Sequence, residues 1–182
     1  MRKIVGAINM SIDGYCDHTI FDPSEEVHHH YAELLKNSDA VLYGRITFEL
    51  MKYWQEVLRN PSTDQSMNDF ADSIDKIPKI VFSKTLKTTN WDTAELSENS
   101  LKEEVNILKK QSGKDILIGS RSLIIQLLNL NLLDELQLCF LPIIAGNGLQ
   151  LFENINPKTK LHLQNIKKFS DGGIIHYYTP EK

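Results

Sequence analysis

The sequence predicts an α/β fold with a mostly parallel central sheet, helices on both of its faces and an antiparallel hairpin at its C-terminal edge. Short apolar runs alternate with amphipathic segments along the chain, which is typical of β-α-β units. Near the C-terminus, two strand-like runs at 161–169 and 174–179 flank the turn residues Asp171, Gly172 and Gly173. These runs are therefore expected to pair as an antiparallel edge.

Length, charge and cysteine usage narrow the class of protein. The chain has 182 residues, enough to bury a core, and we expect one domain over residues 1–182. Its formal net charge is −4 without a basic stripe, which disfavours nucleic-acid binding. No apolar run approaches the ~20 residues that cross a bilayer, so we expect no membrane span. Cys16 and Cys139 belong to no C-x-x-C motif, which disfavours a disulfide or a metal site and fits a cytoplasmic protein.

The N-terminal part predicts two strands with a helix between them. The apolar run 3–8 is the first strand. Ser24 is placed to cap a helix whose first turn carries Glu25 and Glu26. Its apolar positions follow the spacing i, i+4, i+7 and i+8 and predict a buried face of Val27, Tyr31, Leu34 and Leu35. The helix leads into a second buried strand at 39–43.

The segment after this strand predicts helix, flap and a third strand. A short helix is expected to start near Thr47 and to reach Trp54. The run 60–64, Asn-Pro-Ser-Thr-Asp, breaks the pattern before a weak helical stretch around 67–74, so this region is expected to be an exposed flap. The apolar run 80–82 is the third strand.

The next helix and strand have clear boundaries in the sequence. Ser100 and Glu103 form a capping box, and Gly113 is expected to end the helix. Its inward positions are Leu101, Val105 and Leu108. A further buried strand follows at 115–119.

The segment 122–130 is apolar nearly all round. Such a helix is expected to lie between the sheet and another layer, because no face of it suits water. Asp134 then introduces a strand at 136–141, and the C-terminal hairpin completes the sheet.

Three strand ends carry small, hydroxyl-bearing or cationic residues. They are Gly44-Arg45-Ile46-Thr47, Ser83-Lys84-Thr85 and Gly119-Ser120-Arg121-Ser122. In an open α/β sheet, ligands bind outside the carboxyl ends of the strands, and helix N-termini attract anions. Each turn alone could be an ordinary strand-to-helix turn with its N-cap. Together they favour a long polyanionic ligand, with a dinucleotide as the obvious candidate.

Several short motifs, taken in order, resemble the dihydrofolate reductase superfamily, specifically the branch that includes the reductase domain of bifunctional riboflavin-biosynthesis proteins. They are Ser11-Ile12-Asp13-Gly14, Gly44-Arg45-Ile46-Thr47, Ser83-Lys84-Thr85, Ile118-Gly119-Ser120 and Leu133-Asp134-Glu135-Leu136, with Pro142 and Gly146-Asn147-Gly148. The resemblance covers the whole chain. It implies a three-layer dihydrofolate reductase-like fold, a reductase activity, NADPH as the cofactor and a homodimer.

In that family NADPH lies across the strand ends, with its pyrophosphate at the Gly-Arg-x-Thr turn. The resemblance therefore implies cofactor contacts at Ala7, Gly44, Arg45, Thr47, Ser83, Lys84, Gly119, Ser120, Arg121 and Ser122. Independently of the family, Arg45, Lys84 and Arg121 supply the extra positive charge that a 2′-phosphate needs and that NADH does not. The alternative is that these cations are solvated surface charges.

Two departures from the family leave the substrate open. The segment after Phe48 lacks the substrate signature of the riboflavin branch, and the position of the acid that holds the pterin ring in dihydrofolate reductases falls on His28. We expect reduction of a C=N or C=O bond in a pteridine or folate-like or ribosylaminopyrimidine-like substrate. His28 and Glu26 are the candidate proton donors. Alternatively, His28 belongs to a solvated cluster with the two following histidines.

Asp13, Tyr53 and Trp54 are the candidate substrate-binding residues. Tyr53 and Trp54 could stack on a flat heterocycle, although core packing is the simpler role. Asp13 could approach the nicotinamide or could only stabilise its own turn. A second hypothesis is a non-catalytic NADPH-binding sensor module, which would explain why His28 stands in place of the acid.

Overall fold

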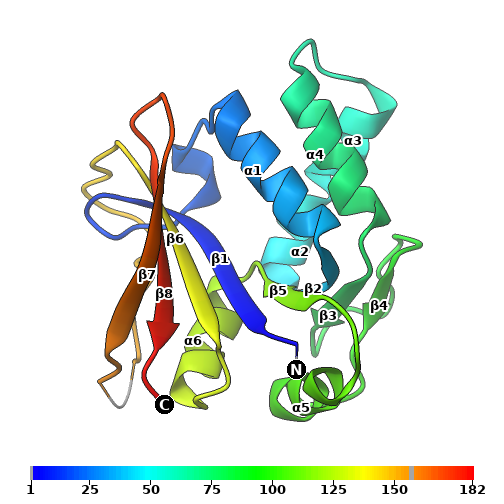
Figure 1. The fold of residues 1–182 in the computed structure, drawn as a ribbon. Coiled ribbons are helices and arrows are strands. Elements are labelled where there is room, and N and C mark those ends of the chain that lie inside the picture. The colour runs from blue at the N-terminus through cyan, green and yellow to red at the C-terminus, as the bar shows by residue number, and fades with distance from the viewer. Residues whose placement is uncertain (1, 156–157) are drawn as a thin grey trace.

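The computed structural model describes residues 2–155 and 158–182 and contains one eight-stranded sheet in the order β4-β3-β2-β5-β1-β6-β8-β7 (Figure 1). The strands are β1 Ile4–Ser11, β2 Ser38–Gly44, β3 Lys79–Phe82, β4 Ala94–Leu96, β5 Asp115–Ile118, β6 Glu135–Leu141, β7 Leu161–Lys168 and β8 Ile174–Pro180. Neighbours among β1 to β6 pair in parallel, whereas β8 is antiparallel to β6 and to β7. The predicted parallel sheet with an antiparallel C-terminal edge is confirmed.

Helices cover both faces of this sheet. They are α1 Glu25–Lys36, α2 Arg45–Met51, α3 Tyr53–Arg59, α4 Gln65–Lys76, α5 Leu101–Lys110 and α6 Arg121–Asn129, with a 3-10 turn, η1, at His18–Ile20. Figure 1 shows α1 and α4 on one side of the sheet and α5 and α6 on the other. Within the described residues, no helix has the length and apolar content needed to cross a lipid bilayer. The predicted three-layer fold is thus confirmed.

Alternation along the strands explains why apolar residues are buried on both faces of the sheet. On β1, Ile4 and Ile8 pack with residues of α5 and α6, whereas Val5 packs with Leu35 of α1 and Ile74 of α4. Successive strand residues point to opposite faces, so one apolar strand supplies both layers. Because β1 to β6 run parallel, the polar residues that follow them lie at one edge of the sheet, where a ligand can bind.

The predicted capping box is confirmed, and two other helices start earlier than predicted. The capping box of Ser100 and Glu103 is present at the start of α5. Helix α2 begins at Arg45 with Gly44 as its N-cap, two residues earlier than predicted, and α6 begins at Arg121 with Ser120 as its N-cap. These shifts bring both helix starts directly against the ends of β2 and β5.

One predicted helix cap and one predicted helix boundary differ from the structure. Ser24 occupies the N-cap position of α1, but its hydroxyl makes no capping hydrogen bond and is buried without a partner within the described chain. Helix α5 ends at Lys110 rather than at Gly113, because Gln111 already has an extended backbone. Gly113 instead adopts a φ of +141° in the following turn, a conformation that suits glycine.

The helical stretch predicted around 67–74 is confirmed as part of helix α4, but the expectation that this region is an exposed flap is wrong. Residues 65–76 form helix α4, which packs against α1, and its Ala71 and Ile74 are buried. Asp64 caps this helix by accepting from the Ser66 N–H at 2.8 Å. The three-residue strand β4 was not predicted, since it is too short to show a period in the sequence.

Candidate cofactor and substrate site

The first cavity lies at the carboxyl ends of β2 and β3 and has a volume of about 560 Å³. Its lining includes the predicted cofactor residues Gly44, Arg45, Thr47, Ser83, Lys84 and Ser122. Segment 97–101, which follows β4, forms the opposite wall. Residues that follow β2 and β3, together with the start of α6 after β5, thus line one cavity. The sequence pattern predicted that these segments would lie close together.

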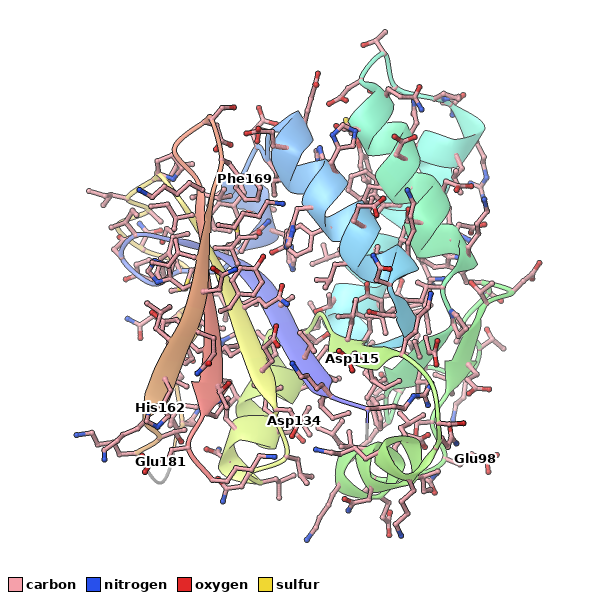
Figure 2. The ribbon with its side chains drawn as sticks, viewed as in Figure 1. Glu98, Asp115, Asp134, His162, Phe169 and Glu181 are labelled. Atoms are coloured by element: carbon pink, nitrogen blue, oxygen red, sulfur yellow. The ribbon has the colours of Figure 1, made fainter. Side chains whose placement is uncertain are left out.

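The charges in this cavity favour an anion. Arg45 and Lys84 are exposed, and neither forms an ion pair with another described residue. One carboxylate, Glu98, also lines the cavity, and Figure 2 labels it beside α5. Two unpaired cations against one carboxylate leave the lining net positive.

Glycines let β2 and β5 end close together at this edge. The Gly44 N–H donates to Ser120 Oγ at 2.9 Å, and the Gly119 N–H donates to the Leu42 carbonyl at 3.3 Å. A Cβ on Gly119 would lie 2.6 Å from the Tyr43 ring, so only glycine fits. Ser120 is 1% exposed and its hydroxyl accepts from Gly44, which places it behind the turn rather than in the cavity lining.

A second cavity, of about 460 Å³, adjoins the first across the end of β2. Tyr43 lines this cavity, whereas the next residue, Gly44, lines the first. Of the predicted residues, it is lined by Ala7, Gly119, His28, Tyr53 and Trp54. Its other walls are mainly aromatic or aliphatic, with Phe21, Val27, Tyr31, Leu50, Met51, Met67 and Phe70. An apolar pocket next to a cationic one suits a ligand with a phosphate part and a flat ring part.

An apolar stripe connects the two cavities. Ile46, Leu50 and Tyr53 are 69%, 42% and 56% exposed, and Ile46 lines the first cavity while the other two line the second. Their spacing of four and three residues places them along one side of α2 and the start of α3. Exposed apolar surface of this kind usually marks a binding surface.

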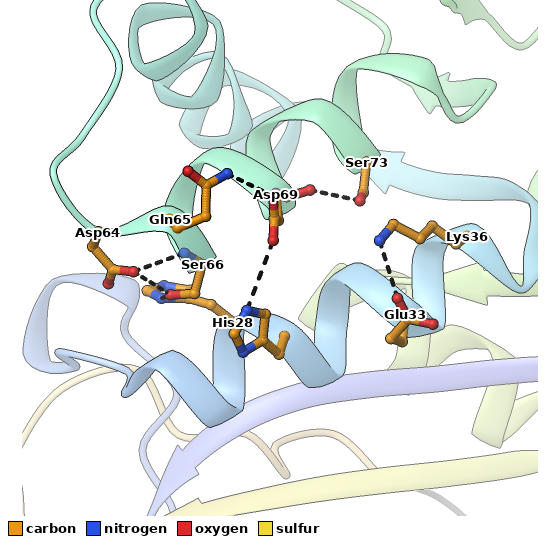
Figure 3. Close-up of polar contacts among 9 residues, drawn as sticks. His28, Glu33, Lys36, Asp64, Gln65, Ser66, Asp69 and Ser73 are labelled. Carbon is orange, nitrogen blue, oxygen red and sulfur yellow. Dashed lines mark hydrogen bonds and ion pairs between the residues drawn. The ribbon is translucent and has the colours of Figure 1, made fainter.

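His28 stands on α1 at the wall of the second cavity. Its ring centroid lies 5.7 Å from that of Trp54 and 6.2 Å from that of Phe70. Nδ1 is 3.5 Å from the Ser66 hydroxyl, which itself donates to Asp64 at 2.7 Å (Figure 3). Burial lowers the pKa of His28 below its ordinary value, so the imidazole is mostly neutral at pH 7.

Two predicted site residues bind other parts of the chain and do not line either cavity. Glu26 accepts from the Ser170 N–H at 2.6 Å, which joins α1 to the hairpin and lowers the pKa of Glu26. Arg121 donates to the Gln150 carbonyl at 2.5 Å and pairs with Glu153 at 2.5 Å. Their geometry is that of loop anchors, and a role in proton donation or cofactor binding has no support from their position.

Asp13 likewise anchors a loop. It accepts from the backbone N–H groups of Ala145 at 2.9 Å and Gly146 at 2.7 Å and from the Ser11 hydroxyl at 2.7 Å. These hydrogen bonds stabilise the carboxylate and lower the pKa of Asp13 to about 2. Asp13 is also absent from the described lining of both cavities. Its bonds therefore cross to a distant loop rather than closing only its own turn.

The structure adds polar residues that sequence reasoning missed. Asp22, in the loop before α1, lines the second cavity, and so does Asn9 on β1, whose Oδ1 accepts from the Tyr31 hydroxyl at 2.7 Å. The alternation that places Ala7 at this face of β1 also places Asn9 there. Asp22 carried no comparable signal, because its loop has no regular period.

Solved structures of similar fold define the class. A putative riboflavin biosynthesis protein from Shewanella sp. PV-4 matches with a TM-score of 0.74 and 20% identity, covering 100% of both chains. The dihydrofolate reductase from Enterococcus faecalis, complexed with NADP(H), matches with a TM-score of 0.65 and 13% identity over 99% of this chain and 97% of that one. The protein therefore has a dihydrofolate reductase-like fold.

A family model narrows this class. The RibD C-terminal domain model matches residues 2–175, and the chain belongs to that family. A relative, the uncharacterized protein YyaP of Bacillus subtilis (strain 168), is 32% identical over 181 residues, which cover 95% of this chain and 92% of YyaP. Family and fold together support an oxidoreductase of the riboflavin or folate type.

Proposed function

We propose that the protein is an NADPH-dependent reductase of a C=N or C=O bond in a flat nitrogen heterocycle, either pteridine or folate-like or ribosylaminopyrimidine-like. The observation that supports it is the junction of two unlike cavities at the end of β2. One carries the unpaired cations Arg45 and Lys84, and the other is lined by aromatic rings. A phosphorylated coenzyme with a flat reactive ring fits this division.

The residues of the site suit NADPH. Gly44 and Thr47 would lie at the pyrophosphate and Ser83, Lys84 and Arg45 at the 2′-phosphate side. Gly119 and Tyr43 both line the second cavity, where the ring would lie. Bound NADPH supplies a hydride to an electron-poor carbon and leaves as NADP⁺. The chain contributes the binding charges and a pocket wall that excludes water.

His28 is the group we propose for the matching proton. Because the Ser66 hydroxyl donates to Asp64, its oxygen is left to accept from Nδ1 of His28. That arrangement leaves Nε2 for the substrate, and the imidazolium form can pass the Nε2 proton to the substrate nitrogen or oxygen. The hydride and this proton together complete the reduction.

The test is oxidation of NADPH, followed at the nicotinamide absorbance band with pterin and aminopyrimidine substrates. A non-catalytic NADPH-binding sensor is the second candidate, and the bonding of Glu26 to Ser170 outside the cavity favours it. A reductase consumes NADPH in the presence of a substrate. A sensor binds NADPH and oxidises none.

We further propose that the protein is a cytoplasmic homodimer. The edge strand β7 exposes Leu163 and Ile166, which a second copy of the chain could cover in a dimer. Cys16 and Cys139 are free thiols, which suits the reducing conditions of the cytoplasm. Light scattering on the purified protein tests the dimer, since it should report twice the mass of one chain. A monomer at micromolar concentration would reject it.

A further inference from the structure

The two cavities differ in charge as well as in shape. Among the described residues that line the second cavity there is no lysine or arginine, and Asp22 is its one carboxylate. The first cavity, by contrast, carries Arg45 and Lys84. Among the described lining residues, a phosphate group has an arginine and a lysine as partners on one side of the end of β2, and only the histidines His18 and His28 on the other.

The lysine nearest in sequence to this lining is directed elsewhere. Lys52 lies between the lining residues Met51 and Tyr53, but its Nζ is 3.1 Å from the Glu49 carboxylate and 5.0 Å from the centre of the Phe48 ring. An anionic substrate would have to break this pair to gain a cation. The described lining of the second cavity therefore offers an anion no lysine or arginine.

One carboxylate, that of Asp22, lines the second cavity. Asp22 is exposed at the rim of this cavity, and its side chain makes no hydrogen bond with any other residue in the described part of the chain. Burial has the largest effect on the pKa of His28 and lowers it, whereas the Asp64 and Asp22 carboxylates act in the opposite direction. A phosphate or carboxylate placed here would lose water and meet like charge, whereas an N–H group would meet an acceptor.

We propose that the substrate is a flat nitrogen heterocycle that bears N–H donors and no phosphate or carboxylate, and that Asp22 is the residue that selects it by accepting those donors. This inference rests on the proposed function and narrows its substrate class, because it removes substrates with a ribose phosphate. Aromatic walls hold the ring faces, and Asp22 binds the donor edge. The arginine and the lysine of the site, Arg45 and Lys84, serve only the coenzyme.

The test compares two fluorescent ligands that differ by one negative charge, pterin and pterin-6-carboxylate. Their affinities are measured by fluorescence titration with the NADPH-loaded protein and again with the protein alone. Pterin should bind at least about tenfold more tightly than its carboxylate, since one unpaired buried charge costs at least that much. The variant Asp22→Asn should weaken pterin about tenfold and reduce the preference between the two ligands. Asp72→Asn, the same change at an exposed ion pair on α4, is the control and should alter neither affinity.

The inference would be overturned if the two ligands bound equally, if pterin-6-carboxylate bound more tightly, or if neither bound. It would also be overturned if the Asp22→Asn variant kept the same preference for pterin over its carboxylate. Failure of the proposed function gives a separate result, because it would appear as absent NADPH binding in a titration without any pterin. The charge preference is still measured in that case with the protein alone. The two failures are thus distinguishable.

Discussion

Arg45 and Lys84 differ from Arg121 in what holds them. Arg121 is bound to the Gln150 carbonyl and to Glu153, whereas Arg45 and Lys84 line a cavity and pair with no other described residue. The sequence pattern could place all three near strand ends. It could not show which of these cations would bind the loop after β6. That contact joins segments about thirty residues apart, and it depends on the conformation of the loop.

The first prediction concerns cofactor choice. Arg45→Ala and Lys84→Ala should each weaken NADPH binding by ~1 to 3 kcal/mol and NADH binding by less, because only NADPH carries the 2′-phosphate. Glu98 lines the same cavity and could bind the ribose hydroxyls of NADH, so the variants are measured with NADH as well as with NADPH. Calorimetric titration with both coenzymes measures the difference, with Lys110→Ala on the exposed end of α5 as the matched control. Equal losses for both coenzymes would remove the 2′-phosphate from these residues.

The second prediction concerns the proton. Burial places the folded pKa of His28 below its ordinary value, so the imidazolium that donates is lost as pH rises through that lowered pKa. The rate kcat/KM should therefore fall with rising pH over a range below the ordinary histidine pKa. His28→Ala should lower turnover, abolish this dependence and leave NADPH affinity unchanged. An unaltered pH profile in the variant would assign the proton to another group.

At the scale of elements, the sequence predicts features that depend on residues close together in the chain. The capping box of α5 depends on residues three apart, and the sequence identified it. Helix α4 was underestimated because Ser, Asn and Asp fill much of it, and its helical state depends on packing against α1. Strand β4 is held by pairing with β3, a contact that no local pattern records.

Packing of α4 can be tested by truncation. Ile74 is 1% exposed, so Ile74→Ala should reduce the free energy of unfolding by ~2 to 5 kcal/mol. Ile107→Ala removes the same atoms from an exposed position on α5 and should cost well under half as much. Urea unfolding measures both. Similar small losses would return this segment to the exposed flap that its sequence suggests.

The junction of β2 and β5 gives a fourth prediction. A Cβ at position 119 would lie 2.6 Å from the Tyr43 ring, whereas one at position 44 would lie 3.3 Å from the Ser122 hydroxyl with an ordinary φ of −77°. Gly119→Ala should therefore reduce the free energy of unfolding by ~1 to 3 kcal/mol, and Gly44→Ala by less. Urea unfolding of the two variants decides this. A smaller loss for Gly119→Ala would contradict the close contact of the two strand ends.

At the scale of the whole molecule, the fold brings residues from distant segments into one two-part site. The parallel strands bring Gly44, Ser83 and Gly119 to one edge, and the helices α1 to α4 enclose the aromatic part. Figure 2 places Phe169 at one end of the hairpin and Asp134 near the opposite end of the sheet. The sequence predicted the edge correctly because parallel strands share one polarity. It missed Asp22, since a loop position has no period to reveal it.

The central claim is that these strand ends form one NADPH site. Isothermal titration of the purified protein with NADPH tests it most directly. The account predicts saturable binding of one NADPH per chain, weaker binding of NADH, and strongly reduced NADPH binding when Arg45 and Lys84 are both replaced by alanine. No heat of NADPH binding, or full binding by the double variant, would contradict it.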